Sequence, residues 1–300
     1  MRPIRCSRCR NSQNRYHHRC HKHQHSPPSG DRGLRYDDAS ADERTLHPRD
    51  RPSLRPQIAS MGLNQTTTAQ MEEFAHLMRR LWRGEIIVDY EGPLGRFPKL
   101  ALGPDFNEEI RLGTTAFGPA TLALAGRAFD VVVLHTFFAD ETVERCVQTI
   151  KEAAERAGRD PGRVKIWSCY ATVVADVGEQ AFVKKTVGRL ATYLQVYGDL
   201  LVSTNRWDPA SLEKFRASEV VNELDGWADT VATPEQLERL REVLPAEWLD
   251  CAAAGSAQQC AQKVRHQFDL GVDGVIMHGA TPSELESVIK SYTQKYCRTG

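Results

Sequence analysis

The chain has 300 residues, enough for one large barrel or two ordinary domains. Hydrophobic residues make up 41% of it and 39 basic side chains balance 39 acidic ones, a composition typical of a globular protein. It contains no run of about 18 apolar residues, and its N-terminus lacks the apolar core of a secretory signal. These features argue against a membrane or secreted protein, and we expect a cytoplasmic one.

The balanced total charge hides a break near residue 60. Residues 1–60 hold 13 Lys and Arg against 6 Asp and Glu, about +7, whereas residues 61–300 hold 26 against 33, about −7. Many of the histidines and three of the 8 cysteines also lie in the first segment. We therefore predict two parts, a basic Arg/His/Cys-rich segment over 1–60 and a folded domain over 61–300.

The basic segment raises the question of a metal or nucleic-acid site. Cys6 and Cys9 form a CxxC pair, and Cys20 lies among several histidines, which are the ligands that zinc prefers. A zinc finger also needs a small apolar nucleus and a second ligand pair at a defined spacing, and the segment has neither. Its arginines form no helical stripe, which disfavours nucleic-acid binding. We expect a disordered tail without a metal site, and a frameshift product is the alternative explanation of its composition.

From residue 64 the sequence alternates between helical and extended patterns. A capped helix is predicted over 69–82, and the glycines of 85–100 indicate a hairpin or excursion. The predicted strands are 111–117, 130–136, 164–175 and 274–277. The later predicted helices are 119–128, 140–157, 179–202, 234–244, 257–270 and 283–296. This alternation indicates a parallel α/β sheet, either open or closed into a barrel.

Several common catalytic signatures are absent. No GxGxxG follows a predicted strand and no P-loop is present, so a Rossmann or nucleotide-hydrolysing domain is not supported. There is no nucleophile elbow and no HExxH, so hydrolases find no support either. The later cysteines have no paired spacing and are expected to be buried free thiols: Cys146, Cys169, Cys251, Cys260 and Cys297. Aromatic residues of the long helical region are expected to serve packing: Tyr193, Tyr197 and Trp207.

Candidate site residues follow the predicted strands, because the site of a parallel barrel lies at the carboxyl ends of its strands. His135 and His278 each end a very apolar strand, where imidazole could bind a cofactor carbonyl or phosphate, or could cap the barrel rim. Gly118, ahead of a helix, frees backbone N–H groups, although an ordinary turn would look the same. The full candidate set is Phe117, Gly118, Pro119, His135, Thr136, His278 and Gly279.

Three ordered pieces of the sequence resemble the luciferase-like superfamily of oxidoreductases. The first is a strand end, Gly118-Pro119 and a helix that ends Ala125-Gly126-x-x-x-Asp130 before a buried strand. The second runs from Ala153 to Pro161 before another strand. The third runs from Gly255 to Cys260 and then from Phe268 to Ile276. Together they look most like the actinobacterial members that use coenzyme F420.

The resemblance implies a (β/α)8 TIM barrel that binds coenzyme F420, or alternatively FMN, at the carboxyl ends of its strands. It implies hydride transfer between that ring and a small organic substrate, with Phe117, Gly118 and Pro119 against the cofactor and His135 and Thr136 nearby. The His278-Gly279 end matches the usual phosphate corner of such barrels. No catalytic acid or base carries over. By resemblance, a homodimer is the expected assembly.

The family's first four strands have no counterpart before Gly62. We therefore expect a barrel portion truncated to its last four strands, with unpaired edges that could impair activity or promote dimerisation. Three further interpretations stay open. One is an FMN-dependent luciferase-like monooxygenase of the same fold, and another is a zinc- or nucleic-acid-binding protein acting through residues 1–60. The third is an inactive half-barrel that serves as a partner for another chain.

Overall fold

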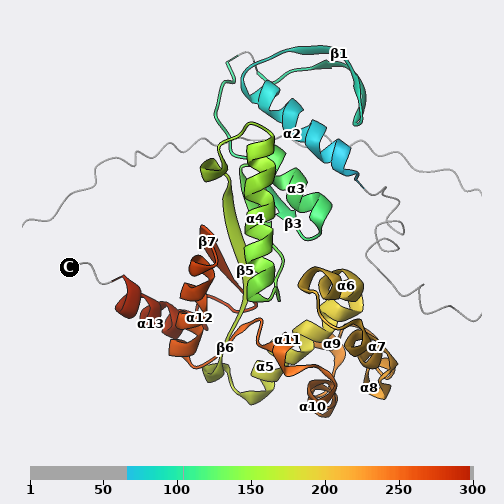
Figure 1. Cartoon of the computed structure of the whole chain (residues 1–300), viewed down its shortest axis with the longest axis vertical. Coiled ribbons are helices and arrows are strands. Elements are labelled where there is room, and N and C mark those ends of the chain that lie inside the picture. Colours follow the sequence, from blue (N-terminus) through green and yellow to red (C-terminus); the bar gives the residue numbers. More distant parts are fainter. Residues whose placement is uncertain (1–65, 104, 298–300) are drawn as a thin grey trace, which may run out of the picture. The chain divides into compact units, whose positions relative to one another are not determined.

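The computed structural model describes residues 66–103 and 105–297 (Figure 1). It begins with helix α2, Thr68–Trp82, which is fixed at its start by a capping box between Thr67 and Gln70. An antiparallel hairpin follows, formed by β1, Ile87–Gly92, and β2, Gly95–Leu100. Both features agree with the sequence prediction. The predicted tail over 1–60, with its cysteines and histidines, lies outside the described residues.

The centre of the described chain is a parallel sheet. Its strands are β3 (Gly113–Ala116), β4 (Val131–Leu134), β5 (Lys165–Val174), β6 (Ala253–Gly255) and β7 (Gly274–His278). They follow the order β3-β4-β5, after which β7 pairs with the first half of β5 and β6 with its second half. Every pairing in this sheet is parallel, as the strand–helix alternation predicts.

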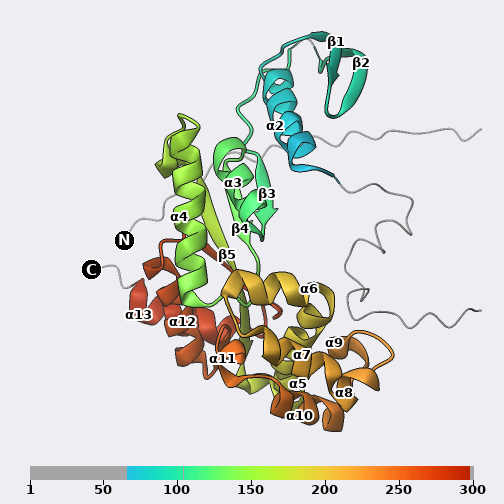
Figure 2. The ribbon, with the colours of Figure 1, turned by 45° about the vertical axis from the view of Figure 1, so that its right-hand side comes forward.

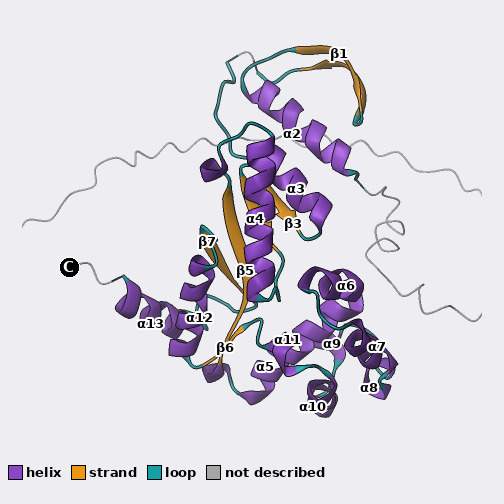
Figure 3. Ribbon diagram, in the orientation of Figure 1, coloured by secondary structure: helices purple, strands orange, loops and turns teal. Residues whose placement is uncertain are grey.

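Helices pack against one face of this sheet (Figure 3). They are α3 (Pro119–Ala128), α4 (Asp140–Arg156), α12 (Ala257–Asp269) and α13 (Glu286–Tyr296). Strand residues such as Val132 and Ile166, both fully buried, form a core with helix residues such as Ile150. On the C-terminal side, Val264 and Val288 belong to a second core cluster.

A helical segment connects β5 to β6 (Figure 2). After the 3-10 turn Ala175–Val177 it consists of α5 (Glu179–Val183), a π-helical turn (Lys184–Gly188), α6 (Arg189–Asn205), α7 (Pro209–Ala217), α8 (Glu219–Asn222), α9 (Ala228–Val231), α10 (Pro234–Val243) and α11 (Ala246–Leu249). Trp248 is buried in it and stacks on Trp207 with ring centroids 4.6 Å apart, so the packing role predicted for Trp207 is confirmed.

The structure corrects three details of the predicted elements. The parallel sheet has five strands rather than four, because the short β6 lacks the apolar run by which the others are recognised. The last helix begins at Glu286 rather than at residue 283. The helix predicted over 179–202 is divided by the π-helical turn Lys184–Gly188. No helix in the described part of the chain is long and apolar enough to cross a membrane.

Candidate functional site at the carboxyl ends of the strands

Three of the predicted site residues lie at neighbouring strand ends. Phe117 follows β3, His135 follows β4, and His278 ends β7. The Phe117 and His135 rings stack nearly parallel, with centroids 4.1 Å apart and an interplanar angle of 9°. Residues two apart on a strand share a face, so His135 continues the face of Val131 and Val133. The predicted convergence of these strand ends is therefore present.

Helix α6 places two tyrosines over this cluster. The Tyr197 ring meets His135 edge-on at 5.4 Å, and the Tyr193 ring does so at 5.1 Å. The Tyr193 hydroxyl lies 3.2 Å from Nε2 of His278 and so links α6 to the last strand. The sequence pattern predicts only a packing role for both tyrosines. Their i, i+4 spacing with Arg189 shows a common helix face but does not show what that face covers.

Arg189 completes the surroundings of His278. Its Nη1 lies 3.1 Å from Nε2 of His278, and its Nε forms an ion pair of 2.9 Å with Asp229. A guanidinium only donates, so Nε2 accepts from Arg189 and the ring is neutral. Burial and the charge of Arg189 both lower the pKa of His278, in agreement with a neutral ring. Nε2 is thus already engaged as an acceptor.

His135 is held by a different contact. Its Nδ1 lies 3.0 Å from the carbonyl oxygen of Thr136, so Nδ1 carries the proton and donates to that oxygen. Burial lowers the pKa of His135, and nearby His278 lowers it further, while the bond to the carbonyl acts in the opposite direction. The ring is therefore neutral near pH 7, and its Nε2 is left as a hydrogen-bond acceptor.

The two histidines predict an acid-side loss of stability. Their pKa values in the folded chain lie below the ordinary value of 6.5. As the pH falls through 6.5, the unfolded chain takes up protons that the folded chain does not, so the free energy of unfolding decreases until the folded-state pKa values are reached. Urea unfolding between pH 7 and 5 should show this slope, and His135→Gln should make it shallower. An unchanged slope in the variant would contradict the assignment of His135.

The remaining predicted residues have more varied positions. Gly118 is the N-cap of α3 and Pro119 is its exposed first residue, while the Thr121 hydroxyl donates to the Gly118 carbonyl oxygen. Gly279 has a φ of +89°, and a Cβ added there would meet no atom within 4 Å, so its backbone faces open space. Thr136 is buried, and its hydroxyl has no hydrogen-bond partner.

The predicted phosphate corner after β7 is occupied by a side chain of the same protein. Glu284 accepts a hydrogen bond of 2.7 Å from the backbone N–H of Thr281 and pairs with Lys185 at 2.6 Å. The Lys185 hydrogen bond and the Thr281 N–H lower the pKa of Glu284 to about 2. The corner therefore has the donors an anion requires, but a phosphate would have to displace the Glu284 carboxylate to use them.

These residues are compatible with a flat heteroaromatic ring carrying carbonyl and N–H groups. Phe117 and the tyrosines offer aromatic surfaces, and Nε2 of His135 is an acceptor. The open backbone of Gly279 allows close approach, and the Thr136 hydroxyl lacks a partner. The thiols do not compete as catalytic groups at Cys146 and Cys251, where burial raises the pKa to about 12. Cys297, in contrast to the sequence expectation, is exposed.

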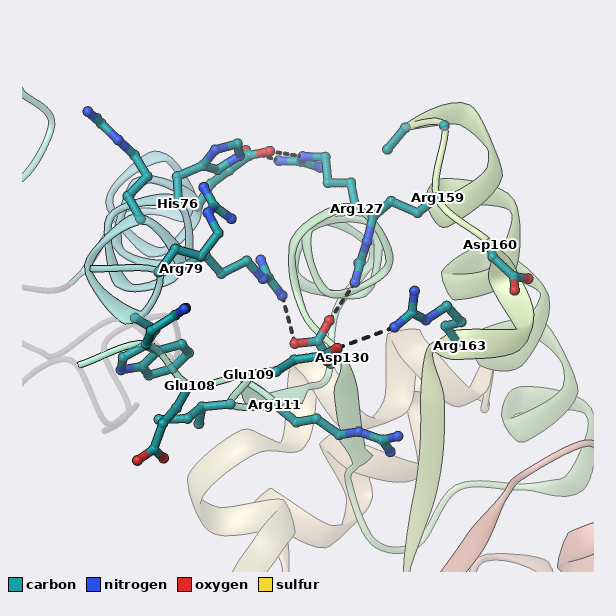
Figure 4. A pocket seen from close by; sticks show the side chains of 18 residues that line it. His76, Arg79, Glu108, Glu109, Arg111, Arg127, Asp130, Arg159, Asp160 and Arg163 are labelled. Atoms are coloured by element: carbon teal, nitrogen blue, oxygen red, sulfur yellow. Dashed lines mark hydrogen bonds and ion pairs between the residues drawn. The ribbon is translucent and has the colours of Figure 1, made fainter. Parts of the chain in front are cut away.

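A second candidate region lies at the opposite end of β4, where α2 meets α3 and the loop after α4 (Figure 4). It is a cavity of about 1140 Å³ with several arginines in its wall. Asp130, just before β4, accepts hydrogen bonds from Arg79 (2.8 Å), Arg159 (2.8 Å) and the backbone N–H of Leu112 (3.0 Å). Glu72 similarly binds Arg127. Asp130 and Glu72 thus pair with three of the arginines in the cavity wall, and we interpret the region as a network of ion pairs that stabilises the fold.

Comparison with known proteins agrees with this architecture. The family model "luciferase-like monooxygenase" matches residues 56–274. The chain belongs to this family. The resemblance seen in the sequence is thereby confirmed, together with the TIM-barrel type of its sheet. Among curated proteins, the search gave no match.

Solved structures with the same fold match the chain at low identity. A coenzyme F420-dependent tetrahydromethanopterin reductase from Methanopyrus kandleri is 15% identical, with a TM-score of 0.58, covering 80% of this chain and 70% of that one. A monooxygenase from Streptomyces bottropensis is 19% identical, with a TM-score of 0.50, covering 82% of this chain and 66% of that one. The chain thus spans about two thirds of the length of these proteins.

Proposed function

We propose that this luciferase-like chain binds coenzyme F420 at the carboxyl ends of its parallel strands and takes part in hydride transfer to or from a small organic substrate. The observation that carries the proposal is the convergence of Phe117, His135 and His278 at neighbouring strand ends, under the tyrosines of α6. This is the end at which parallel barrels hold their ligands. FMN, in a monooxygenase of the same family, is the alternative.

Two observations support the deazaflavin over FMN. The sequence pieces that end in Asp130 and Pro161 look most like the F420-using members of the superfamily. The reductase from Methanopyrus kandleri, which shares the fold, is named as F420-dependent. Spectra of the bound cofactor separate the two, because FMN and the deazaflavin differ in absorbance and fluorescence.

A bound deazaflavin supplies hydride transfer, and the protein supplies binding and orientation. The neutral His135 would accept a hydrogen bond through Nε2, since its Nδ1 is committed to the Thr136 carbonyl. The half-buried Tyr193 and Tyr197 keep water away from the rings of the cluster. Arg189, anchored by Asp229, holds His278 as a neutral acceptor and keeps a positive charge beside it. No residue is assigned as a catalytic acid or base.

Fluorescence titration of the purified full chain with F420, and separately with FMN, tests the proposal. We expect saturable binding of F420, and His135→Ala should weaken it about tenfold, the effect of losing one hydrogen bond in a partly buried site. His76→Ala is the matched control, because His76 is an exposed histidine in the wall of the cavity at the opposite strand end. Saturable binding of neither cofactor, or equal loss in both variants, would contradict the proposal.

A further inference from the structure

The two faces of the parallel sheet differ in what covers them. On β5, Ile166 is fully buried and Ser168 is 3% exposed, and the Ser168 hydroxyl donates to the side chain of Gln267 on α12. Trp167, between them, is 42% exposed. Since alternate residues point to opposite faces, the helices cover the face of Ile166. On the face of Trp167, the tyrosines of α6 cover the strand end at His135 and leave Trp167 open. We call this second face the inner face.

The inner face is largely apolar. Val131 and Val133 of β4 and Ile276 of β7 lie on it, each partly exposed. The Trp167 ring lies over Gly274, where an added Cβ would come within 3.1 Å of the ring. Val133 of β4 is the register partner of Trp167, so these side chains form a contiguous, partly exposed apolar patch of the kind that marks an interaction surface. Among the described residues, none removes Trp167 from solvent.

The sheet also has the width of half a barrel. At any level it is four strands across, because β6 and β7 pair with different halves of the same edge of β5. Its lateral strands are therefore β3 on one side and β7, followed by β6, on the other. Barrels of this class need eight parallel strands, so two such sheets supply the required number.

We propose that two copies of this chain close one eight-stranded barrel, inner face against inner face. A twofold axis along the barrel keeps all strands parallel and places β3 of each copy beside β7 of the other. Asp273, just before β7, already pairs with Lys165 at 2.9 Å and accepts a hydrogen bond from the Ile166 N–H, so the two edges match in strand direction rather than in charge. Closure would pair both free edges and bury both copies of Trp167.

The composition of the chain favours a second copy, rather than the chain's own N-terminal segment, as the partner that covers the inner face. Residues 1–60 carry a charge of about +7 and contain no apolar run of the kind that forms parallel strands. The inner face offers mainly apolar side chains rather than acidic ones. A second copy presents an apolar face of the same kind and two edge strands whose direction allows parallel pairing with β3 and β7.

Sedimentation velocity of the full chain over a range of concentrations tests the proposal. We expect a dimer, and Trp167→Glu should raise its dissociation constant at least tenfold, because closure would bury the new charge. Ile289→Glu is the matched control, since Ile289 is 46% exposed on α13, on the helix-covered side, and should leave the dimer intact. A monomer at all concentrations, or a dimer weakened only by Ile289→Glu, would overturn the proposal.

Hydrogen exchange on the unaltered chain gives an independent readout should Trp167→Glu fail to fold. In the proposed dimer, exchange in β3 and β7 slows as the concentration rises through the dissociation constant. A monomer in which these strands and Trp167 are already protected would mean that the chain's own N-terminal segment covers the inner face. That result, like fast exchange at all concentrations, would overturn closure by a second copy.

Discussion

Gly126→Ala is expected to destabilise the fold by about 1–3 kcal/mol, the range in which overpacking of a tight core falls. Gly126 is buried where α3 crosses α4. A Cβ there would overlap the carbonyl oxygen of Ile150 and lie 2.9 Å from Cβ of Ala153, so the backbone of α4 would have to move. Urea unfolding of the full chain measures the change.

Gly113→Ala is the matched control for this prediction. Gly113 begins the edge strand β3, and an added Cβ would meet nothing closer than 3.7 Å, an ordinary van der Waals distance. We expect its free energy of unfolding to stay within about 0.5 kcal/mol of that of the unaltered chain. Equal losses in both variants would mean that the close approach of α3 and α4 is not the cause.

Asp130→Asn is expected to cost about 2–3 kcal/mol of stability, because it leaves two partly buried arginines without their shared carboxylate. Arg79 and Arg159 both donate to Asp130, and all three side chains are about one quarter exposed. The Leu112 N–H also donates to this carboxylate and ties the start of β3 to that of β4. The site at the other strand end should keep its cofactor affinity, which a titration of the folded variant measures.

Glu109→Gln is the control in the same cavity wall. Glu109 pairs with Arg163 at 3.4 Å, but both side chains are strongly exposed, so the change should cost less than about 0.5 kcal/mol. Burial would raise the pKa of Asp130, but the Leu112 N–H and the two arginines hold it below 3.8. The stabilisation of the folded chain by ionised Asp130 is therefore present above pH 3.8 and is lost as the pH falls toward the folded-state pKa.

Equal losses of stability in Asp130→Asn and Glu109→Gln would contradict the special role of Asp130.

The sequence predicted the parallel sheet because its main strands are apolar runs between turn residues. DVVVLHT, from Asp130 to Thr136, contains β4, and the run from Val164 to Ala175 contains β5. The fifth strand, β6, was missed because three small residues, Ala253–Gly255, carry no periodicity. The structure also explains the family motif that ends in Asp130. Gly126 permits the close crossing of α3 and α4, and Asp130 links the start of β4 to that of β3 through the Leu112 N–H.

The candidate site was predictable only in part. Phe117, His135 and His278 could be found from their positions at strand ends. Arg189 and Tyr193 could not, because their relation to His278 depends on how a helix 85 or more residues earlier in the chain folds back over the last strand. The hydrogen bond from the Thr281 N–H to the Glu284 carboxylate was likewise not predicted from the sequence, although capping by an acidic residue three positions later is a common local pattern.

The most direct test of cofactor binding at the carboxyl ends is hydrogen exchange of the full chain with and without F420. We expect slower exchange on binding in the segments at 117–119, 135–136 and 278–279, and no change around Arg79 and Arg159 at the opposite end. Protection confined to the arginine-rich cavity, with the three strand ends unaffected, would contradict the account.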